Sequence, residues 1–246
     1  MKIIYEPKGR AAEYGKLAVN LFSGCTGRCL YCYVPNVLRT SREEFHKDAK
    51  PIPRILEKFE ADCIALEKAG NTEPIFISFC TDPWPIGNWV CQDETKRAIR
   101  IAHENGQTVN ILTKNGNIAG LMHLLGLGDT FGVTLTCANP YDREVWEPGA
   151  DSTFERIEAL RSACDMGVET RASFEPVLFP DQTLEMIRQV RPFTDLIQVG
   201  KLNPRPGMAP EVWERERAID WPKFAVDARA LLESLPGKWM IKHDLM

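Results

Sequence analysis

The feature that most constrains the fold of this chain is a regular alternation of short apolar runs with segments of helical periodicity. The apolar runs lack a polar alternation, which is typical of strands covered on both faces. Apolar residues in the intervening segments recur three and four residues apart, as on one face of a helix. Because such a pattern calls for a parallel sheet, we predict an α/β fold, either barrel-like or doubly wound. The predicted strands are 17–22, 74–79, 108–112, 131–135, 169–174, 196–199 and, as one more candidate, 239–241.

Capping residues mark the ends of several predicted helices. Ser152 and Glu155 form a capping box, so a helix is predicted to start there. Asp181 is predicted to cap a helix that Pro192 ends, and Asp220 is predicted to cap the last long helix. The order strand, loop, helix therefore repeats about six times along the chain.

The length and composition are those of one large domain. The chain has 246 residues, of which 44% are apolar, so a sizeable core can be buried. We find no internal repeat and no linker, and we predict a single domain over 1–246. Its core is expected over about 14–203, with a C-terminal helix and strand in 204–246. The stretch 203–220 is rich in Pro, Arg and Glu and is predicted to be a surface excursion.

The charge of the chain argues against binding nucleic acid through bulk positive charge. The formal net charge is -4 and the sequence pI is about 5.7. No run of about 18 apolar residues occurs, so no membrane span is predicted. The first sixteen residues lack the apolar core of a signal peptide. We therefore predict a cytoplasmic protein without membrane contact.

Three of the eight cysteines lie within eight residues of one another. Cys25, Cys29 and Cys32 have the spacing C-x3-C-x2-C, in a loop that follows a predicted strand. Three thiolates can bind three irons of a cubane cluster and leave the fourth iron open to a cofactor or substrate. A closed zinc or electron-transfer site needs a fourth ligand, and His46 or Cys63 would supply it only outside a recognised spacing. We therefore favour an open iron–sulfur cluster over zinc, and either over core thiols grouped by chance.

This cysteine motif, with an aromatic residue before its last cysteine, resembles the signature of radical S-adenosylmethionine enzymes. Further segments resemble the branch of that superfamily related to spore photoproduct lyase. The resemblance extends from about Tyr14 to about Asn203, which is most of the chain. The segments that carry the second resemblance are 20–25, 31–35, 81–84, 113–114 and 147–148.

The resemblance implies a fold, two cofactors and a type of reaction. The fold would be a partial (β/α)6 TIM-like barrel with parallel strands. A 4Fe-4S cluster bound by the three cysteines would reductively cleave S-adenosyl-L-methionine, and the resulting 5′-deoxyadenosyl radical would abstract hydrogen from a substrate. The chain would thus be an enzyme of lyase-like type that takes electrons from a reductant protein such as a flavodoxin or ferredoxin.

The resemblance leaves two matters of function open. A DNA-repair reaction is a narrower form of the radical-enzyme hypothesis, and the negative net charge of the chain does not support it. A local basic set alternates with glutamates and is predicted to be a solvated mixed-charge face. The alternative function is an iron–sulfur or zinc redox module without S-adenosylmethionine turnover. The members of the basic set are Lys201, Arg205, Arg215 and Arg217.

Polar residues directly after predicted strands are the candidates for cofactor binding, because parallel barrels carry their chemistry at this edge. The resemblance implies that Thr81 and Asp82 contact the methionine amino group. It also implies that Lys114 contacts the methionine carboxylate. Thr134 and Thr136, on the predicted strand 131–135 and directly after it, are candidates to donate a hydroxyl to the carboxylate or ribose. Tyr31 would lie near adenine, largely through its backbone. The structural alternatives are turn formation for Thr81 and Asp82, solvation for Lys114 and strand packing for Thr134.

Cys80 is the candidate catalytic residue, because it ends a predicted strand directly before Thr81. In the related lyases a cysteine at this place returns a hydrogen atom to the product radical, and the resemblance implies the same role here. The alternative is a small buried hydrophobic residue at a strand end. Cys137, which also ends a strand, is a second candidate for this role. Glu175 ends another strand and is a further candidate for cofactor binding, with an ordinary surface carboxylate as the alternative. The cysteines interpreted as structural are Cys63, Cys91 and Cys164.

Overall fold

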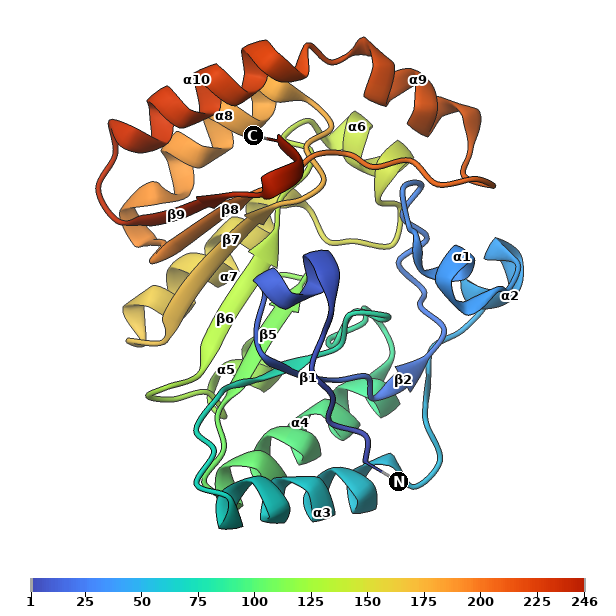
Figure 1. Ribbon diagram of the computed structural model, residues 1–246, viewed down its shortest axis with the longest axis vertical. Helices are drawn as coiled ribbons and strands as arrows, with labels where there is room; N and C mark the ends of the chain where they lie inside the picture. Colours follow the sequence, from blue (N-terminus) through green and yellow to red (C-terminus); the bar gives the residue numbers. More distant parts are fainter. Residues whose placement is uncertain (1, 246) are drawn as a thin grey trace.

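The computed structural model describes residues 2–245 and contains a seven-stranded sheet in which every neighbouring pair is parallel. The strands follow one another across the sheet in chain order, from β1 at one edge to β9 at the other (Figure 1). Parallel neighbours need crossover connections, and these contain the helices. The strands are β1 (Leu17–Val19), β4 (Ile75–Ile77), β5 (Val109–Thr113), β6 (Thr130–Thr134), β7 (Glu169–Phe174), β8 (Leu196–Val199) and β9 (Lys238–Ile241).

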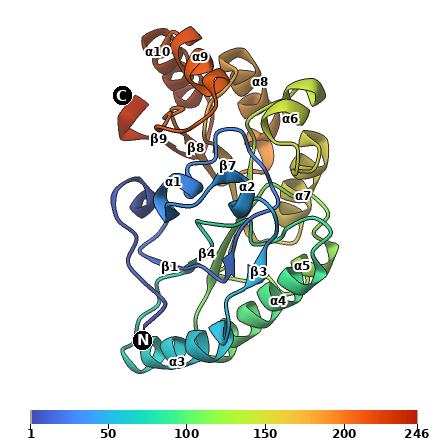
Figure 2. The same cartoon turned by 90° about the vertical axis from the view of Figure 1, so that its right-hand side faces the viewer.

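The long helices cover the outer face of the curved sheet, as Figure 2 shows. Helix α7 packs against β6 and β7, and α3 packs against α4. All residues of β1, β4 and β6 are buried, as expected for strands covered on both faces. This arrangement confirms the predicted α/β fold and the open, barrel-like sheet. The helices of this layer are α3 (Ile55–Lys68), α4 (Trp89–Glu104), α5 (Ala119–Met122), α7 (Thr153–Asp165), α8 (Pro180–Val190) and α10 (Trp221–Glu233).

The remaining elements lie at the ends and open side of the sheet. A small antiparallel pair, β2 with β3, follows β1 and flanks the cysteine loop. At the N-terminus, the carbonyl oxygen of Tyr14 accepts hydrogen bonds from Asn110 on β5 and Arg171 on β7. The N-terminal segment therefore reaches the inner side of the sheet. These elements are β2 (Phe22–Ser23), β3 (Lys50–Pro51), α1 (Val34–Leu38), α2 (Arg42–Phe45), α6 (Pro140–Trp146), α9 (Pro210–Ala218), and the 3-10 helices η1 (Gly9–Glu13), η2 (Arg191–Phe193) and η3 (His243–Leu245).

The first predicted strand, 17–22, is divided between β1 and β2. The division follows from the side chain of Asn20, whose Oδ1 accepts hydrogen bonds from the backbone N–H groups of Phe79 and Cys80 at 3.0 and 3.2 Å. A side chain thus replaces the backbone ladder at this point, and the chain leaves the sheet toward the cysteine loop.

The predicted helix caps are confirmed at two of three positions. Ser152 and Glu155 form the capping box of α7, and the Asp220 side chain accepts a hydrogen bond from the Lys223 N–H at the start of α10. The prediction for Asp181 was wrong, since α8 begins at Pro180 and Asp181 lies in its first turn. Proline suits the first helical position because its missing N–H would have no helical partner there.

The predicted surface excursion 203–220 contains a helix, α9, and is not simply a loop. Val212 on this helix is fully buried in a small apolar cluster with Trp146, Leu178 and Leu202. That contact fixes the segment over the carboxyl ends of the strands. Between residues 2 and 245, every helix is too short or too polar to span a lipid bilayer.

Candidate functional site

A cavity of about 520 Å³ lies at the carboxyl ends of the strands. Parallel barrels carry their binding sites at this edge, because successive strand ends and their loops converge there. The cavity contains nine of the residues that the sequence singled out as catalytic, cofactor-binding or metal-binding. They are Cys25, Cys29, Tyr31, Cys32, Cys80, Thr81, Asp82, Lys114 and Thr134.

The cysteine loop brings its thiols to one side of the cavity, where all three are half-buried. A β-carbon on Gly27 would lie 3.4 Å from the Cys25 sulfur and 3.7 Å from the Cys29 sulfur, so both sulfurs flank one point. The loop turns sharply at Gly24 and Arg28, which have φ values of 74° and 52°. The tight turn thus gathers thiols that are seven residues apart in the chain.

The thiol arrangement fits a cluster better than a single ion. In the part of the chain that the structure describes, no three His, Cys, Asp or Glu side chains are arranged to hold one metal ion. In a cubane cluster each thiolate binds a different iron, so the thiolates stand further apart than the ligands of one zinc ion. His46 and Cys63, the alternative fourth ligands, do not line the cavity. Neither of the two alternative fourth ligands is therefore placed beside the three cysteines in the cavity wall.

Burial disfavours the thiolate form of these cysteines. It raises the pKa of Cys25 and Cys29 above the ordinary value and that of Cys32 to about 11. Lys114 opposes this effect at all three thiols. A cationic group that stabilises the thiolates is thus built into the wall beside the loop.

Thr81 and Asp82 connect the cysteine loop to the strand ends. The Thr81 hydroxyl donates to the Gly24 carbonyl at 2.6 Å. The Asp82 carboxylate accepts hydrogen bonds from the Thr113 hydroxyl at 2.6 Å and the Lys114 N–H at 2.7 Å. It also accepts one from the N–H of Trp84. Burial raises the pKa of Asp82 above its ordinary value, and these donors offset part of that effect. Both residues therefore hold the loops after β2, β4 and β5 together while facing the cavity.

Replacing Asp82 by alanine is expected to lower the free energy of unfolding by about 1–3 kcal/mol, because its hydrogen-bond donors lose their acceptor in a buried wall. Urea denaturation followed by circular dichroism measures the change. Asp93→Ala, at an exposed carboxylate of α4, is the control and is expected to stay within about 0.5 kcal/mol of the unmodified protein. Equal stability of the two variants would contradict this assignment.

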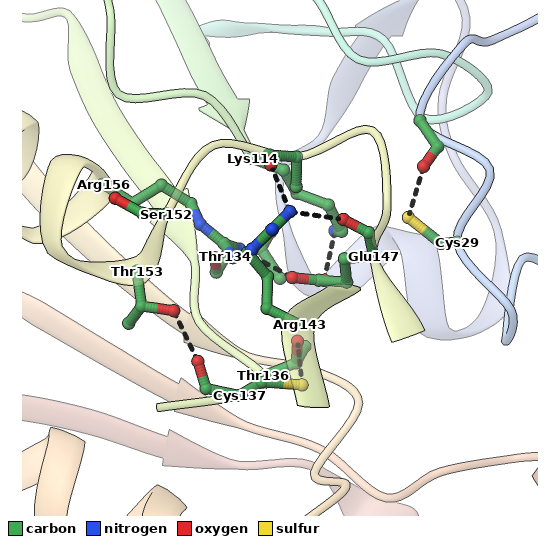
Figure 3. A network of polar contacts seen from close by, with 12 residues as sticks. Cys29, Lys114, Thr134, Thr136, Cys137, Arg143, Glu147, Ser152, Thr153 and Arg156 are labelled. Atoms are coloured by element: carbon green, nitrogen blue, oxygen red, sulfur yellow. Dashed lines mark hydrogen bonds and ion pairs between the residues drawn. The ribbon is translucent and has the colours of Figure 1, made fainter. Parts of the chain in front are cut away.

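A buried network links the cysteine loop to β6 and α7 (Figure 3). The Tyr31 hydroxyl donates to one oxygen of Glu147, and Arg156 NH1 lies 2.8 Å from the other. Arg156 also donates to the carbonyl of Thr134 at 2.7 Å, and both members of the ion pair are fully buried. Burial alone would raise the pKa of Glu147, but Arg156 and Lys114 hold it below the ordinary value. Glu147 is therefore an anion that fixes Tyr31, the residue next to Cys32.

Lys114 faces the cavity beside this network. Its ammonium lies 4.0 Å from Glu147 and 5.8 Å from the centre of the Tyr31 ring. Its side chain is 23% exposed, so it is neither the fully solvated lysine of the structural alternative nor a closed ion pair. A cation held in this way can still approach an anionic group that enters the cavity.

The end of β6 carries residues with different surroundings. Thr134 is buried in the cavity wall. The hydroxyl of Thr136 lies 3.5 Å from the Cys137 sulfur, and neither residue lines the cavity (Figure 3). Cys137 therefore lies outside the cavity wall, in the small apolar cluster under α9 against which Tyr31 packs.

A second wall of the cavity is built from the two ends of the chain. Lys242, directly after β9 and 1% exposed, lies 2.7 Å from Glu175 and 3.0 Å from Glu13. Arg10 binds the other oxygen of Glu175 at 2.7 Å, and the Tyr14 hydroxyl donates to Glu175 as well. Glu175 is thus the centre of a charged cluster that closes the open side of the sheet.

Two members of the basic set, Lys201 and Arg205, do not lie simply on a solvated face as predicted. Lys201 and Arg205 line the cavity, because α9 holds their segment over the strand ends. Lys201 pairs with Glu216 on α9 at 3.1 Å and lies 4.9 Å from the Trp221 ring centre. Their positions depend on the packing of α9, which the mixed charges of the sequence do not reveal.

Several residues of the site were missed in the sequence. Arg156 has a detectable signal, since it lies on the apolar face of α7 together with Ile157 and Leu160. Lys242 follows a predicted strand directly, as the candidates that were chosen do. Arg10 and Tyr14 lie in a segment without strand or helix periodicity and have no such signal.

Comparisons with known proteins were consistent with this geometry. The family model described as the radical SAM superfamily matches residues 19–192, well over half of the chain. A spore photoproduct lyase variant with bound AdoMet and dinucleoside spore photoproduct has 16% identity and a TM-score of 0.69, covering 92% of this chain and 76% of that chain. Spore photoproduct lyase complexed with dinucleoside spore photoproduct has 15% identity and a TM-score of 0.71, covering 97% and 79%.

A third similar structure is SuiB from Streptococcus suis bound to S-adenosylmethionine. It has 11% identity and a TM-score of 0.65, covering 92% of this chain and 49% of that chain. At such identities these likenesses show a shared fold. A comparison with curated protein sequences found no match. The family match includes Cys25–Cys32 and four strands that end at the cavity, β4 to β7. This chain therefore belongs to the radical SAM superfamily, whose enzymes use a 4Fe-4S cluster and S-adenosylmethionine and need an electron donor.

Proposed function

We propose that Cys25, Cys29 and Cys32 bind three irons of the 4Fe-4S cluster and that S-adenosylmethionine occupies the adjoining cavity. When bound, these groups supply one-electron cleavage of S-adenosylmethionine to methionine and a 5′-deoxyadenosyl radical, which takes a hydrogen atom from the substrate. The observation that carries the proposal is the convergence of three thiols with Thr81, Asp82 and Lys114 on one cavity of about 520 Å³.

Asp82 and Thr81 keep free capacity for the amino group of the cofactor. An ionised carboxylate has about four acceptor sites, and the three donors of the described chain leave one for an ammonium. The Thr81 oxygen donates its hydrogen to Gly24 and can still accept. Both residues can therefore orient the cofactor while they hold the loops.

Lys114 and Thr134 are proposed to bind the carboxylate of the cofactor. The Lys114 side chain is 23% exposed and its ammonium lies 4.0 Å from Glu147, which is a long distance for an ion pair. The ammonium can therefore still contact an anionic group in the cavity. The Tyr31 hydroxyl is already bound to Glu147, so a contact of Tyr31 with adenine would involve its backbone or ring. The network thus holds these contacts in fixed positions before the cofactor binds.

Cys80 is proposed to return a hydrogen atom to the product radical. It is half-buried in the cavity wall beside Thr81, and burial raises the pKa of its thiol above the ordinary value. At neutral pH the group therefore keeps its hydrogen, which a donor of hydrogen atoms requires. The Asn20 side chain fixes the backbone N–H of Cys80 at 3.2 Å.

Alkylation of the iron-loaded protein tests the state of the Cys80 thiol. Because the thiolate is the reactive form, iodoacetamide is expected to modify Cys80 with a pH midpoint above about 8.5, the value of an ordinary thiol. Mass spectrometry of the Cys80 peptide gives the rate, and Cys80→Ala identifies that peptide. A midpoint at or below the ordinary value would show a thiolate at work and would contradict the proposed donor role.

Anaerobic reconstitution tests the function as a whole. The protein is loaded with iron and sulfide, reduced with dithionite and supplied with S-adenosylmethionine, and 5′-deoxyadenosine is measured by chromatography. We expect its release in proportion to the iron bound. An iron-loaded protein that releases none would contradict the proposal and would favour a redox module without S-adenosylmethionine turnover.

A lyase-type reaction on a nucleotide-like substrate is the narrower proposal. Six of the eight charged residues that line the cavity are basic, although the whole chain has a net charge of -4. A cleft with an excess of one charge concentrates ligands of the opposite charge. Dinucleoside spore photoproduct labelled with deuterium is the probe, since two similar lyase structures contain this compound. Deuterium in 5′-deoxyadenosine supports this substrate, whereas cleavage without transfer rules it out.

The electron donor is proposed to be a small reductant protein such as a flavodoxin or ferredoxin. Arg28, the central residue of the cysteine loop, is exposed, so the loop reaches the surface of the chain. An electron carrier can therefore approach the cluster without entering the cavity. The cytoplasmic location stays a prediction.

A further inference from the structure

The backbone carbonyls of all three cysteines contact one short segment, 42–46. Arg42 donates from NH1 to the Cys32 carbonyl at 2.9 Å and from NH2 to the Cys29 carbonyl at 2.7 Å. His46 places its Nδ1 2.9 Å from the Cys25 carbonyl. None of the roles proposed above uses this segment, yet it contacts each of the proposed iron ligands.

The segment is itself fixed, so it can hold the loop in place. Ser41 caps α2 by accepting a hydrogen bond from the Glu44 N–H, which sets Arg42 at the first helical position. The N–H of Cys25 donates to the Phe45 carbonyl at 2.9 Å, and a side chain on Gly24 would overlap the backbone of Asp48. His46 is buried, and its ring meets that of Phe45 edge-on.

Arg42 brings a positive charge that no carboxylate neutralises. Between residues 2 and 245 its side chain forms no ion pair, and both hydrogen bonds of the guanidinium go to cysteine carbonyls. A cluster with three thiolates is negatively charged and gains a further negative charge on reduction. A guanidinium beside it therefore favours the reduced form, since nearby charge and hydrogen bonding set the potential of iron–sulfur clusters.

We propose that Arg42 is a positioning residue that clamps the loop of Cys29 and Cys32 and raises the reduction potential of the cluster. His46 completes the clamp at Cys25. The inference rests on the proposed function, because it concerns the cluster that these cysteines are proposed to bind. Its two effects are separable, since the fork of Arg42 sets the geometry and its charge sets the potential.

Redox titration followed by electron paramagnetic resonance tests the charge. In Arg42→Gln the ratio of reduced to oxidised cluster at a fixed potential is expected to fall about tenfold, which is about 59 mV for one electron. Arg42→Lys keeps the charge and is expected to stay close to the unmodified protein. Lys47→Gln removes an exposed positive charge without contact to the loop and is the control. An unchanged potential in Arg42→Gln, or an equal shift in the control, overturns the electrostatic role.

Iron loss to a chelator tests the clamp. Arg42→Lys is expected to lose iron several-fold faster than the unmodified protein, because lysine cannot bind two carbonyls with one planar fork. Because Arg42→Lys keeps the charge, it tests the clamp even where Arg42→Gln does not fold. A rate of iron loss equal to that of the unmodified protein overturns the clamp. Failure of the unmodified protein to bind iron would instead contradict the proposed function. Normal binding with indistinguishable Arg42 variants contradicts only this inference.

Discussion

Replacing Cys25, Cys29 or Cys32 by alanine is expected to remove most of the bound iron and to reduce 5′-deoxyadenosine release to the background of the assay. Each thiolate is proposed to bind one iron, and alanine has no donor atom to replace it. Neither of the alternative fourth ligands, His46 or Cys63, lines the cavity. Iron content, the visible absorption of the cluster and chromatography of 5′-deoxyadenosine measure the three parts of this prediction.

Cys164→Ala is the matched control for these variants. This cysteine is also half-buried, but it lies on α7 and does not line the cavity. The control is therefore expected to retain the iron and the cleavage activity of the unmodified protein. A single alanine variant of the loop that keeps full iron and full cleavage would show that the ligand assignment is wrong.

Replacing Glu147 by alanine is expected to lower the free energy of unfolding by about 3–5 kcal/mol, the usual cost of breaking a buried ion pair from one side. The variant leaves the charge of Arg156 uncompensated in a fully buried position. It also removes the acceptor of the Tyr31 hydroxyl and so loosens the residue next to Cys32. Urea denaturation measures the stability, and the iron content measures the effect on the loop.

Two further variants show whether the effect depends on the buried pair. Lys223→Met breaks an ion pair whose lysine is 71% exposed on α10, and it is expected to cost under about 1 kcal/mol. The double variant Glu147→Leu with Arg156→Met removes both charges and is expected to be more stable than Glu147→Ala. A cost for Glu147→Ala no larger than that of Lys223→Met would contradict the assigned network.

The same pair predicts a dependence on pH. Arg156 and Lys114 hold the pKa of Glu147 below its ordinary value, despite the opposing effect of burial. A carboxyl group of this kind stabilises the folded state above its unfolded pKa, near 4.3, and the stabilisation is lost as the pH falls through its folded pKa. The stability difference between the unmodified protein and Glu147→Ala is therefore expected to be constant near neutral pH and to shrink in acid.

The bounds of a strand could be predicted where no side chain interrupts its backbone hydrogen bonds. The predicted bounds 169–174 and 196–199 are those of β7 and β8, and both strands lie within the sheet with a parallel neighbour on each side. The run 17–22 differs, since a side chain of Asn20 takes over the hydrogen bonds of the sheet at Phe79 and Cys80. Asp181 failed as a cap because the neighbouring Pro180 already suits the first position of the helix.

By itself, the sequence determined the parallel sheet and the residues that gather at its carboxyl edge. Periodicity, capping residues and the spacing of the three cysteines are local properties, and in a parallel sheet chain order is enough to bring strand ends together. Tertiary structure alone decided the buried pair of Glu147 with Arg156, the cluster of Glu175 with Lys242 and the clamp of Arg42. The partners of a buried charge are set by distances after folding, which residue type and separation along the chain do not specify.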